Sequence, residues 1–155
     1  MTQINILSKK EKTQITEQLN KQFGIGKTNG IITTSGRERL FLFQGSLTEK
    51  EIMNLERARI NIERIGVYFA KEINGQIRLS IEGTHLFKDQ ITKNIFELND
   101  EQAEQWMKGN ELDIQTGKND FLVMKYKDDF LGTGKASEKK ISNFIPKNRR
   151  LKENS

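Results

Sequence analysis

The sequence predicts an α+β protein, with a small N-terminal α/β lobe followed by a strand-rich half folded as a small pseudo-barrel with short helices. Three observations predict this class. Two capping boxes open helices, an Asn-Gly turn joins two alternating strands, and a continuous apolar run of strand length begins near residue 121. At 155 residues the chain is one domain of ordinary size, or two small lobes that share a core.

The first predicted helix begins after Ser8 and ends at Gly24. Ser8 and Glu11 have the spacing of a capping box, and apolar residues then recur every fourth position on one face. Strands are predicted at residues 31–34 and 39–43, joined by a short Ser-Gly loop.

A second helix is predicted from about residue 49 to 59. Thr48 and Glu51 form another capping box, and Leu47 and Ile52 have the spacing of a hydrophobic staple. We interpret residues 1–60, with these elements, as the N-terminal lobe and residues 61–155 as a second domain.

The hairpin centred on Asn74-Gly75 is the clearest local signal. Apolar and polar residues alternate over 67–73 and again over 77–82, and Asn-Gly favours the type I′ turn of two-residue hairpins. Gly83 is predicted to end the second strand, and a short helix is predicted to begin near Thr84.

The C-terminal half of the sequence contains weaker signals for helices and strands. Asn99 or Asp100 is predicted to cap a helix that Gly109 ends, and residues 121–126 form a buried strand. The strand predicted at 130–136 contains Gly132 and Gly134. These glycines are expected to let the sheet bend, and they also let a sugar-phosphate backbone approach, which Lys135 beside them slightly favours; the two roles are compatible.

The positive charge is concentrated at the C-terminal end of the sequence. Basic and acidic residues are equal in number over 1–129, so residues 130–155 carry the whole formal net charge of +5. A localised basic block is typical of a polyanion-binding surface, although a solubilising tail has the same composition.

The absence of cysteine excludes disulfides, thiolate metal sites and thiol nucleophiles. One histidine, His85, excludes a multi-histidine metal site, and no stretch has the length and hydrophobicity of a membrane span. We therefore expect no metal, no cofactor, no membrane association and a cytoplasmic location. Gly26-Lys27-Thr28 ends like a phosphate-binding loop, but the glycine required five positions earlier is replaced by Lys21.

Four segments together resemble the PUA domain, a small pseudo-barrel module that binds RNA. They are residues 78–87, residues 106–112, the glycine-bearing strand 130–136 and residues 143–150. The last segment is similar to the Asn-x-x-Pro-Lys-x-x-Arg stretch in the C-terminal domain of NOL1/NOP2/sun-type rRNA cytosine-5 methyltransferases. The resemblance covers residues from about 62 to 151, and the two-part layout also resembles Nip7-type ribosome biogenesis factors.

This resemblance implies a protein that docks structured rRNA or tRNA in RNA modification or ribosome biogenesis. An RNA methyltransferase or preribosomal proteins are the further partners that it implies. The residues expected to contact RNA are Arg78, Gly83, His85, Lys88, Gly132, Gly134, Lys135, Asn143, Lys147, Arg149 and Arg150.

Two differences between this sequence and that family concern catalysis. Those methyltransferases use a cysteine nucleophile, which this sequence lacks, and the glycine-rich adenosylmethionine signature is also missing. We therefore expect the RNA-docking part of such an enzyme standing alone, without catalytic residues. Two alternatives remain: a protein-interaction scaffold in a ribosome-assembly particle, and a small enzyme that uses His85.

Overall fold

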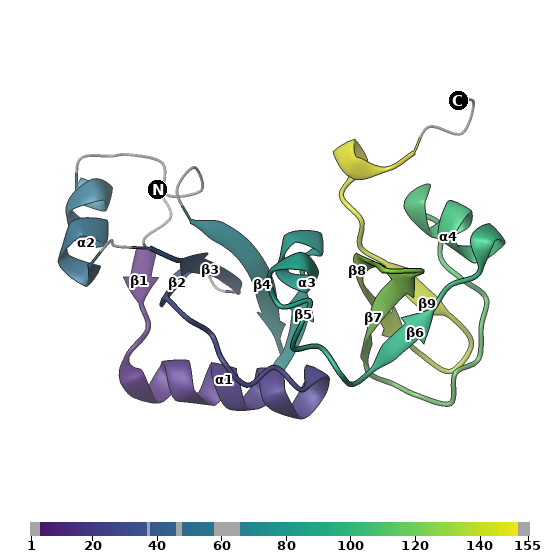
Figure 1. Ribbon diagram of the computed structural model, residues 1–155, viewed down its shortest axis with the longest axis horizontal. Coiled ribbons are helices and arrows are strands. Elements are labelled where there is room, and N and C mark those ends of the chain that lie inside the picture. The colour runs from purple at the N-terminus through teal and green to yellow at the C-terminus, as the bar shows by residue number, and fades with distance from the viewer. Residues whose placement is uncertain (1–3, 37, 46–47, 58–65, 152–155) are drawn as a thin grey trace.

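The computed structural model describes residues 4–36, 38–45, 48–57 and 66–151. In the described residues the strands form two sheets that lie side by side, with a short helix between them (Figure 1). The α+β class expected from the sequence is confirmed. None of the described helices is long and apolar enough to cross a membrane.

The first sheet is antiparallel and has five strands in sequence order. They are β1 (Ile4–Ile6), β2 (Ile31–Ser35), β3 (Arg39–Phe43), β4 (Val67–Ile73) and β5 (Gln76–Leu79). The predicted hairpin is confirmed, since Asn74 and Gly75 both have positive φ angles between β4 and β5.

Two helices cover the two faces of this sheet. Helix α1 (Lys9–Phe23) has the predicted capping box and ends at Gly24, and its buried residues belong to the core cluster that contains Ile32 and Leu42. Helix α2 (Glu49–Arg57) has the predicted Thr48–Glu51 capping contacts and packs Ile52 against Phe41 and Phe43. Strand β3 is buried on both faces for this reason. The predicted staple residue Leu47 lies outside the described residues.

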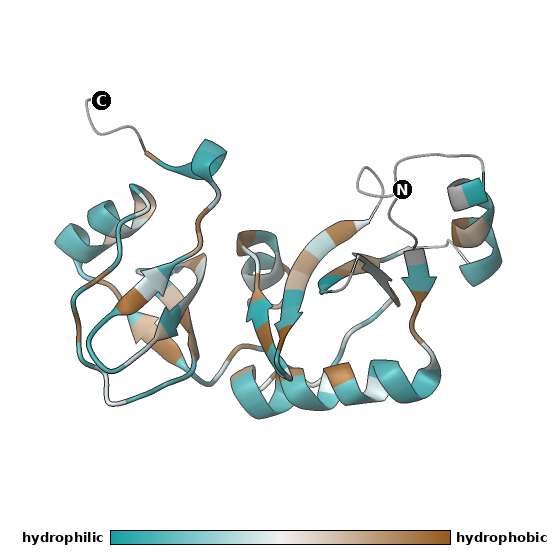
Figure 2. Ribbon diagram, turned by 180° about the vertical axis from the view of Figure 1, so that it is seen from behind, coloured by the Kyte–Doolittle hydropathy of each residue, from teal (hydrophilic) through white to brown (hydrophobic). Residues whose placement is uncertain are grey.

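The second sheet has four strands and does not close on itself. Its strands are β6 (Ile95–Glu97), β7 (Phe121–Tyr126), β8 (Asp129–Ala136) and β9 (Ile141–Asn143), with β6 parallel to β7 and the other pairs antiparallel. Helix α4 (Asp100–Met107) is capped by Asn99, one of the two predicted caps, and its Trp106 belongs to the core cluster that contains Leu122 and Met124. Figure 2 shows hydrophilic residues along α1 and α4 and hydrophobic residues concentrated on the strands.

Strand β7 separates two hydrophobic cores. Phe121 and Val123 lie in the core that α1 shares with the first sheet, whereas Leu122 and Met124 lie in the core under α4. Successive side chains of a strand point to opposite faces, so the continuous apolar run serves both cores. The two halves of the molecule therefore share buried side chains.

Helix α3 (Ile81–Leu86) joins the two sheets. The prediction that the strand continues to residue 82 and that Gly83 ends it is wrong. Strand β5 ends at Leu79, Ser80 caps the helix, and Gly83 lies inside the helix. The physical reason is the Ser80 hydroxyl, which accepts a hydrogen bond from the Gly83 N–H at 2.9 Å.

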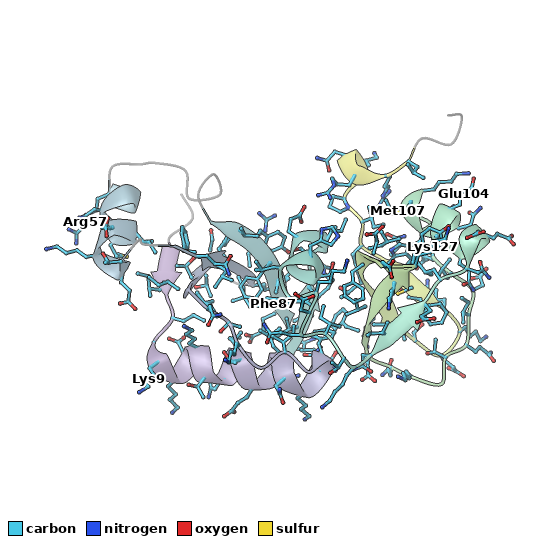
Figure 3. All side chains as sticks on the ribbon, in the orientation of Figure 1. Lys9, Arg57, Phe87, Glu104, Met107 and Lys127 are labelled. Atoms are coloured by element: carbon cyan, nitrogen blue, oxygen red, sulfur yellow. The ribbon has the colours of Figure 1, made fainter. Side chains whose placement is uncertain are left out.

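The predicted domain boundary between residues 60 and 61 lies outside the described residues. Strands on either side of it, β3 and β4, pair within the first sheet. Across the two sheets, the Thr133 hydroxyl donates to the Leu79 carbonyl at 2.9 Å, which holds β5 beside β8. Phe87, which follows α3, is buried near the middle of the molecule (Figure 3). The division into two domains stays a prediction.

We expect Gly83→Ala to destabilise the protein. A Cβ at this position would overlap the Phe69 carbonyl oxygen. Alanine normally stabilises a helix interior by about 1 kcal/mol relative to glycine, but overpacking costs about 1–3 kcal/mol and has no room to relax against backbone. The overpacking cost should therefore be at the upper end of this range, about 3 kcal/mol, and subtracting the helix-propensity gain leaves a net loss of about 2 kcal/mol. The measurement is urea unfolding followed by the fluorescence of the single tryptophan, Trp106.

Gly26→Ala is the matched control, because a Cβ at this position would have no neighbouring atom within 4 Å and the φ of Gly26 is not positive. Its free energy of unfolding should stay within about 0.5 kcal/mol of the wild type. A Gly83→Ala protein as stable as the control would contradict the close contact between α3 and β4.

Candidate nucleic-acid interface

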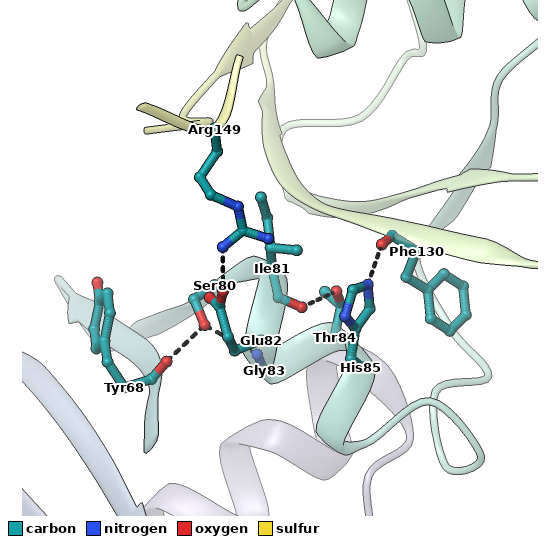
Figure 4. Close-up of polar contacts among 9 residues, drawn as sticks. All are labelled: Tyr68, Ser80, Ile81, Glu82, Gly83, Thr84, His85, Phe130 and Arg149. Atoms are coloured by element: carbon teal, nitrogen blue, oxygen red, sulfur yellow. Dashed lines mark hydrogen bonds and ion pairs between the residues drawn. The ribbon is translucent and has the colours of Figure 1, made fainter. Parts of the chain in front are cut away.

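The start of α3 is fixed against β4 by backbone and hydroxyl contacts. The Ser80 N–H donates to the Phe69 carbonyl at 2.9 Å, and the Ser80 hydroxyl donates to the Tyr68 carbonyl at 2.8 Å. Figure 4 shows the hydroxyl contact together with the cap on Gly83. The predicted RNA contact Gly83 is buried here, where it allows α3 to approach β4 closely.

His85 connects α3 to the second sheet. Its Nε2 lies 2.8 Å from the Phe130 carbonyl oxygen, and because a carbonyl only accepts, Nε2 is the protonated nitrogen in this contact (Figure 4). His85 is otherwise exposed.

Lys88 follows three residues later and is also exposed, and within the described ranges its side chain has no hydrogen-bond or ion-pair partner.

The two glycines of β8 have different surroundings. Gly132 has a φ of +79° and faces Ile81 at the start of α3, so that a Cβ at this position would lie 3.1 Å from the Ile81 side chain. A Cβ on Gly134 would lie 2.6 Å from both Trp106 and Ile141. Gly134 therefore gives room to the core under α4, and Gly132 gives room to α3.

Hydrogen bonds from Asn143 and Arg150 hold the segment after β9 in place, and we call this arrangement the clamp. The Asn143 amide donates to the carbonyls of Trp106 and Asn110 at 2.8 and 3.0 Å, and its oxygen accepts a hydrogen bond from the Ile145 N–H at 2.8 Å. Arg150 donates to the Ile145 carbonyl at 2.9 Å. Asn143 thus holds the backbone that carries the basic residues, a role that its sequence position alone does not reveal.

Gly109 completes this clamp. The guanidinium of Arg150 occupies the space in which a side chain at Gly109 would lie, and the Leu151 N–H donates to the Met107 carbonyl at 2.8 Å. The C-terminal segment therefore returns across the end of α4. Arg150, predicted to contact RNA, uses its side chain to hold this segment in place.

A small groove lies where α3, β5, β8 and the clamped segment meet. Its volume is about 120 Å³, and it is lined by Tyr68, residues 78–82, Gly132, Thr133 and residues 144–146. Pockets for drug-sized ligands have volumes of about 300–1,000 Å³. The groove is therefore well below the usual size of a small-molecule pocket.

Two of the predicted residues, Arg78 and Gly132, line this groove, and Arg149 reaches its rim. Arg149 forms an ion pair with Glu82, a groove residue 67 positions away in the sequence (Figure 4). Lys147 belongs to the same 3-10 turn, η2 (Lys147–Arg149), and is exposed. One cation of β5 therefore lines the groove, and one cation of η2 contacts a carboxylate that lines it.

Lys135 is not among the residues that line the groove. Its ammonium donates to the Asn119 carbonyl and lies 5.5 Å from the centre of the Phe121 ring. The residues expected to contact RNA do not include two groove residues, the carboxylate of Glu82 and the exposed ring of Phe144. The sequence does indicate Phe144 as a ring that could stack on a base, because it is the one aromatic residue in a polar, basic stretch, although phenylalanine is more often a core residue. For Glu82 the sequence gives no signal.

Many basic side chains of the C-terminal block form ion pairs or hydrogen bonds with carboxylates and carbonyls of the same chain. Lys140 pairs with Glu111 at 2.9 Å, which holds the pKa of that carboxyl below its ordinary value, chiefly through the hydrogen bond. Arg149 pairs with Glu82. Within the described ranges, Lys139 and Lys147 are the basic residues after position 129 whose side chains have no hydrogen-bond or ion-pair partner.

The pKa of Glu82 reflects opposing effects. Partial burial raises the pKa of this carboxyl, but the hydrogen bond from Arg149, a backbone hydrogen bond and the charges of Arg149 and His85 together outweigh burial. The pKa of Glu82 therefore lies below the ordinary glutamate value. Because it is lowered in the folded state, the stabilisation by the pair is present at neutral pH and is lost as the pH falls through the folded-state pKa.

Known proteins match parts of this chain. Residues 93–151 match the family model described as the methyltransferase RsmF PUA domain. A protein of Psychromonas ingrahamii named ribosomal RNA small subunit methyltransferase F is 24% identical over 146 residues. That alignment covers 90% of this chain and 29% of the relative, so the chain spans less than a third of that protein's length. The matched segment includes β6–β9, α4 and the clamped C-terminal residues.

We expect Arg149→Gln to raise the pKa of Glu82, because the variant removes the main interactions that favour the charged carboxylate while burial remains. The measurement is a pH titration of the Glu82 side-chain carboxyl carbon by NMR. Lys147→Gln is the matched control, since it removes one charge from the same turn and Lys147 makes no ion pair with Glu82. Equal Glu82 titration curves in the two variants would contradict the ion pair.

Proposed function

Since the chain carries a PUA-like domain similar to that of the sun-type RNA methyltransferases, we propose that it binds structured RNA without catalysing a reaction on it. The observation that supports this proposal most directly is the groove that Arg78 lines and that Arg149 reaches through its ion pair with Glu82, with the exposed Lys147 in the same turn as Arg149. Lysine and arginine side chains at such a rim neutralise phosphates and position a nucleic acid.

The clamp on the C-terminal segment supports RNA docking for a second reason. The hydrogen bonds of Asn143 and Arg150 fix the backbone on both sides of residues 144–149. Cations on an ordered segment lose less conformational entropy on binding than cations on a free tail. This arrangement favours a binding surface over a solubilising tail, the alternative that composition left open.

We propose rRNA or tRNA as the RNA, in RNA modification or ribosome biogenesis. The relative is named as a ribosomal RNA methyltransferase, which favours rRNA. The chain contains no cysteine, so the nucleophile of sun-type methyltransferases is not supplied by these residues. In this proposal an RNA methyltransferase performs the chemistry on the RNA that these residues dock.

A protein-docking function is the second candidate, and one observation favours it. A hollow of about 730 Å³ runs beside α1 across the first sheet and is lined by Glu11, Glu38 and Glu72, with no lysine or arginine among the described lining residues. Glu38 is paired with Lys71 at 3.3 Å. A basic segment of a preribosomal protein has the complementary charge for this hollow.

RNA binding should depend on salt concentration. Neutralising one phosphate contributes about 0.7–0.9 to the slope of log affinity against log salt, so about four contacts give a slope of roughly −3. The measurement is fluorescence anisotropy with labelled rRNA fragments, tRNA and a random RNA over a salt series. A slope near zero would contradict electrostatic RNA docking.

A double variant, Lys147→Ala with Arg149→Ala, should flatten this slope by about 1.5. It leaves the clamp residue Arg150 in place, so the segment should keep its fold. The matched control is Lys9→Ala with Lys10→Ala, which removes two charges from the start of α1, at the other end of the molecule from Met107 (Figure 3). Equal effects of the two double variants would show that the rim is not the docking surface.

A further inference from the structure

Phe144 is an aromatic ring left exposed beside a basic rim. Three large hydrophobic residues in the described part of the chain are exposed, and Phe144, at 37%, is the aromatic one. Burying an aromatic side chain is strongly favourable. The next residue, Ile145, is 3% exposed, so the segment reaches the core while the Phe144 ring stays at the surface.

The ring is held in place by its neighbours. The guanidinium carbon of Arg78 lies 4.3 Å from the ring centre, a cation–π contact that covers part of the ring. The buried Phe121 ring is tilted at 54° to it with 6.3 Å between ring centres. Because Asn143 and Ile145 anchor the backbone on either side, little further ordering is needed for a ligand to stack on Phe144.

The groove beside the ring matches a single aromatic heterocycle in size and character. Its volume of about 120 Å³ is close to that of the engineered cavity of about 150 Å³ that binds benzene. Aliphatic walls come from Leu79, Ile81 and Ile145, and polar groups come from Arg78 and Glu82. A flat ring with hydrogen-bonding edges fits this combination better than an aliphatic side chain.

We propose that Phe144 is a stacking platform for one unpaired RNA base, with Arg78 fixing the ring and the η2 cations holding the adjoining phosphates. This inference rests on the proposed RNA-binding function and specifies its ligand. Bases in a duplex are already stacked on both faces, whereas unpaired bases are free to stack on a protein aromatic ring. The groove therefore selects a loop, bulge or single-stranded end.

The test compares Phe144→Leu with Phe144→Trp. Leucine keeps an apolar side chain but removes the π face, so affinity for a labelled single-stranded RNA should fall about tenfold, within the range found for base–aromatic stacking. The salt slope should stay at its wild-type value, since no cation is removed. Affinity for the fully paired duplex of the same sequence should not change.

Phe144→Trp should retain the affinity, and its indole fluorescence should be quenched when the single strand binds. The emission of the native tryptophan, Trp106, should stay constant on binding because this side chain is fully buried and donates to the Leu131 carbonyl. Val67→Ala is the matched control: Val67 is 38% exposed and lies on β4, outside the residues that line the groove. It should bind both RNAs like the wild type.

The possible outcomes distinguish failure of the stacking proposal from failure of the RNA-docking proposal. If the wild type and Phe144→Leu bind the single strand equally, the stacking platform is wrong and RNA docking stands. If the wild type binds no RNA in a salt-dependent manner, RNA docking itself fails. If Phe144→Leu weakens single-strand and duplex binding alike, or lowers the unfolding midpoint, Phe144 has a structural role and the stacking proposal is overturned.

Discussion

The close packing of α3 between the two sheets is the constraint on which the other features depend. Gly83 has no side chain, so the helix lies directly on the Phe69 carbonyl of β4. On its other side, His85 reaches Phe130, and Gly132 leaves room for Ile81. The groove residues 80–82 are the cap and first turn of this same helix, so the geometry of the groove follows from how closely α3 can approach both sheets.

Much of the fold could be predicted because it is encoded locally. The capping boxes, the Asn-Gly turn and the apolar run of β7 each depend on residues close together in the sequence. Strands β1, β6 and β9 were not predicted, since each has three residues and exists through pairing with a distant partner. The start of α3 was misplaced because the alternating pattern of β5 continues into its first turn, where the Ser80 cap prevails.

The sequence could predict several residues of the candidate site but not which residues they contact. The basic residues and Arg78 could be identified from composition and resemblance, and the structure brings several of them to one groove. Other predicted residues, such as Gly134 and Asn143, make space or hold backbone, which depends on contacts with Trp106 and Asn110. Whether a polar residue faces solvent or supports the fold is decided by such distant partners, which a single sequence does not specify.

In the proposed RNA complex, the ion pair between Arg149 and Glu82 carries a cost. One guanidinium nitrogen of Arg149 already contacts Glu82, so a phosphate that takes over this contact must displace a carboxylate of the same molecule. The cost is the same for every anion that displaces Glu82, so it lowers their affinities alike and leaves the ratios between them unchanged. Under this proposal Glu82 is an internal competitor that sets how tightly the rim holds an anion, and selection among RNAs is left to the groove.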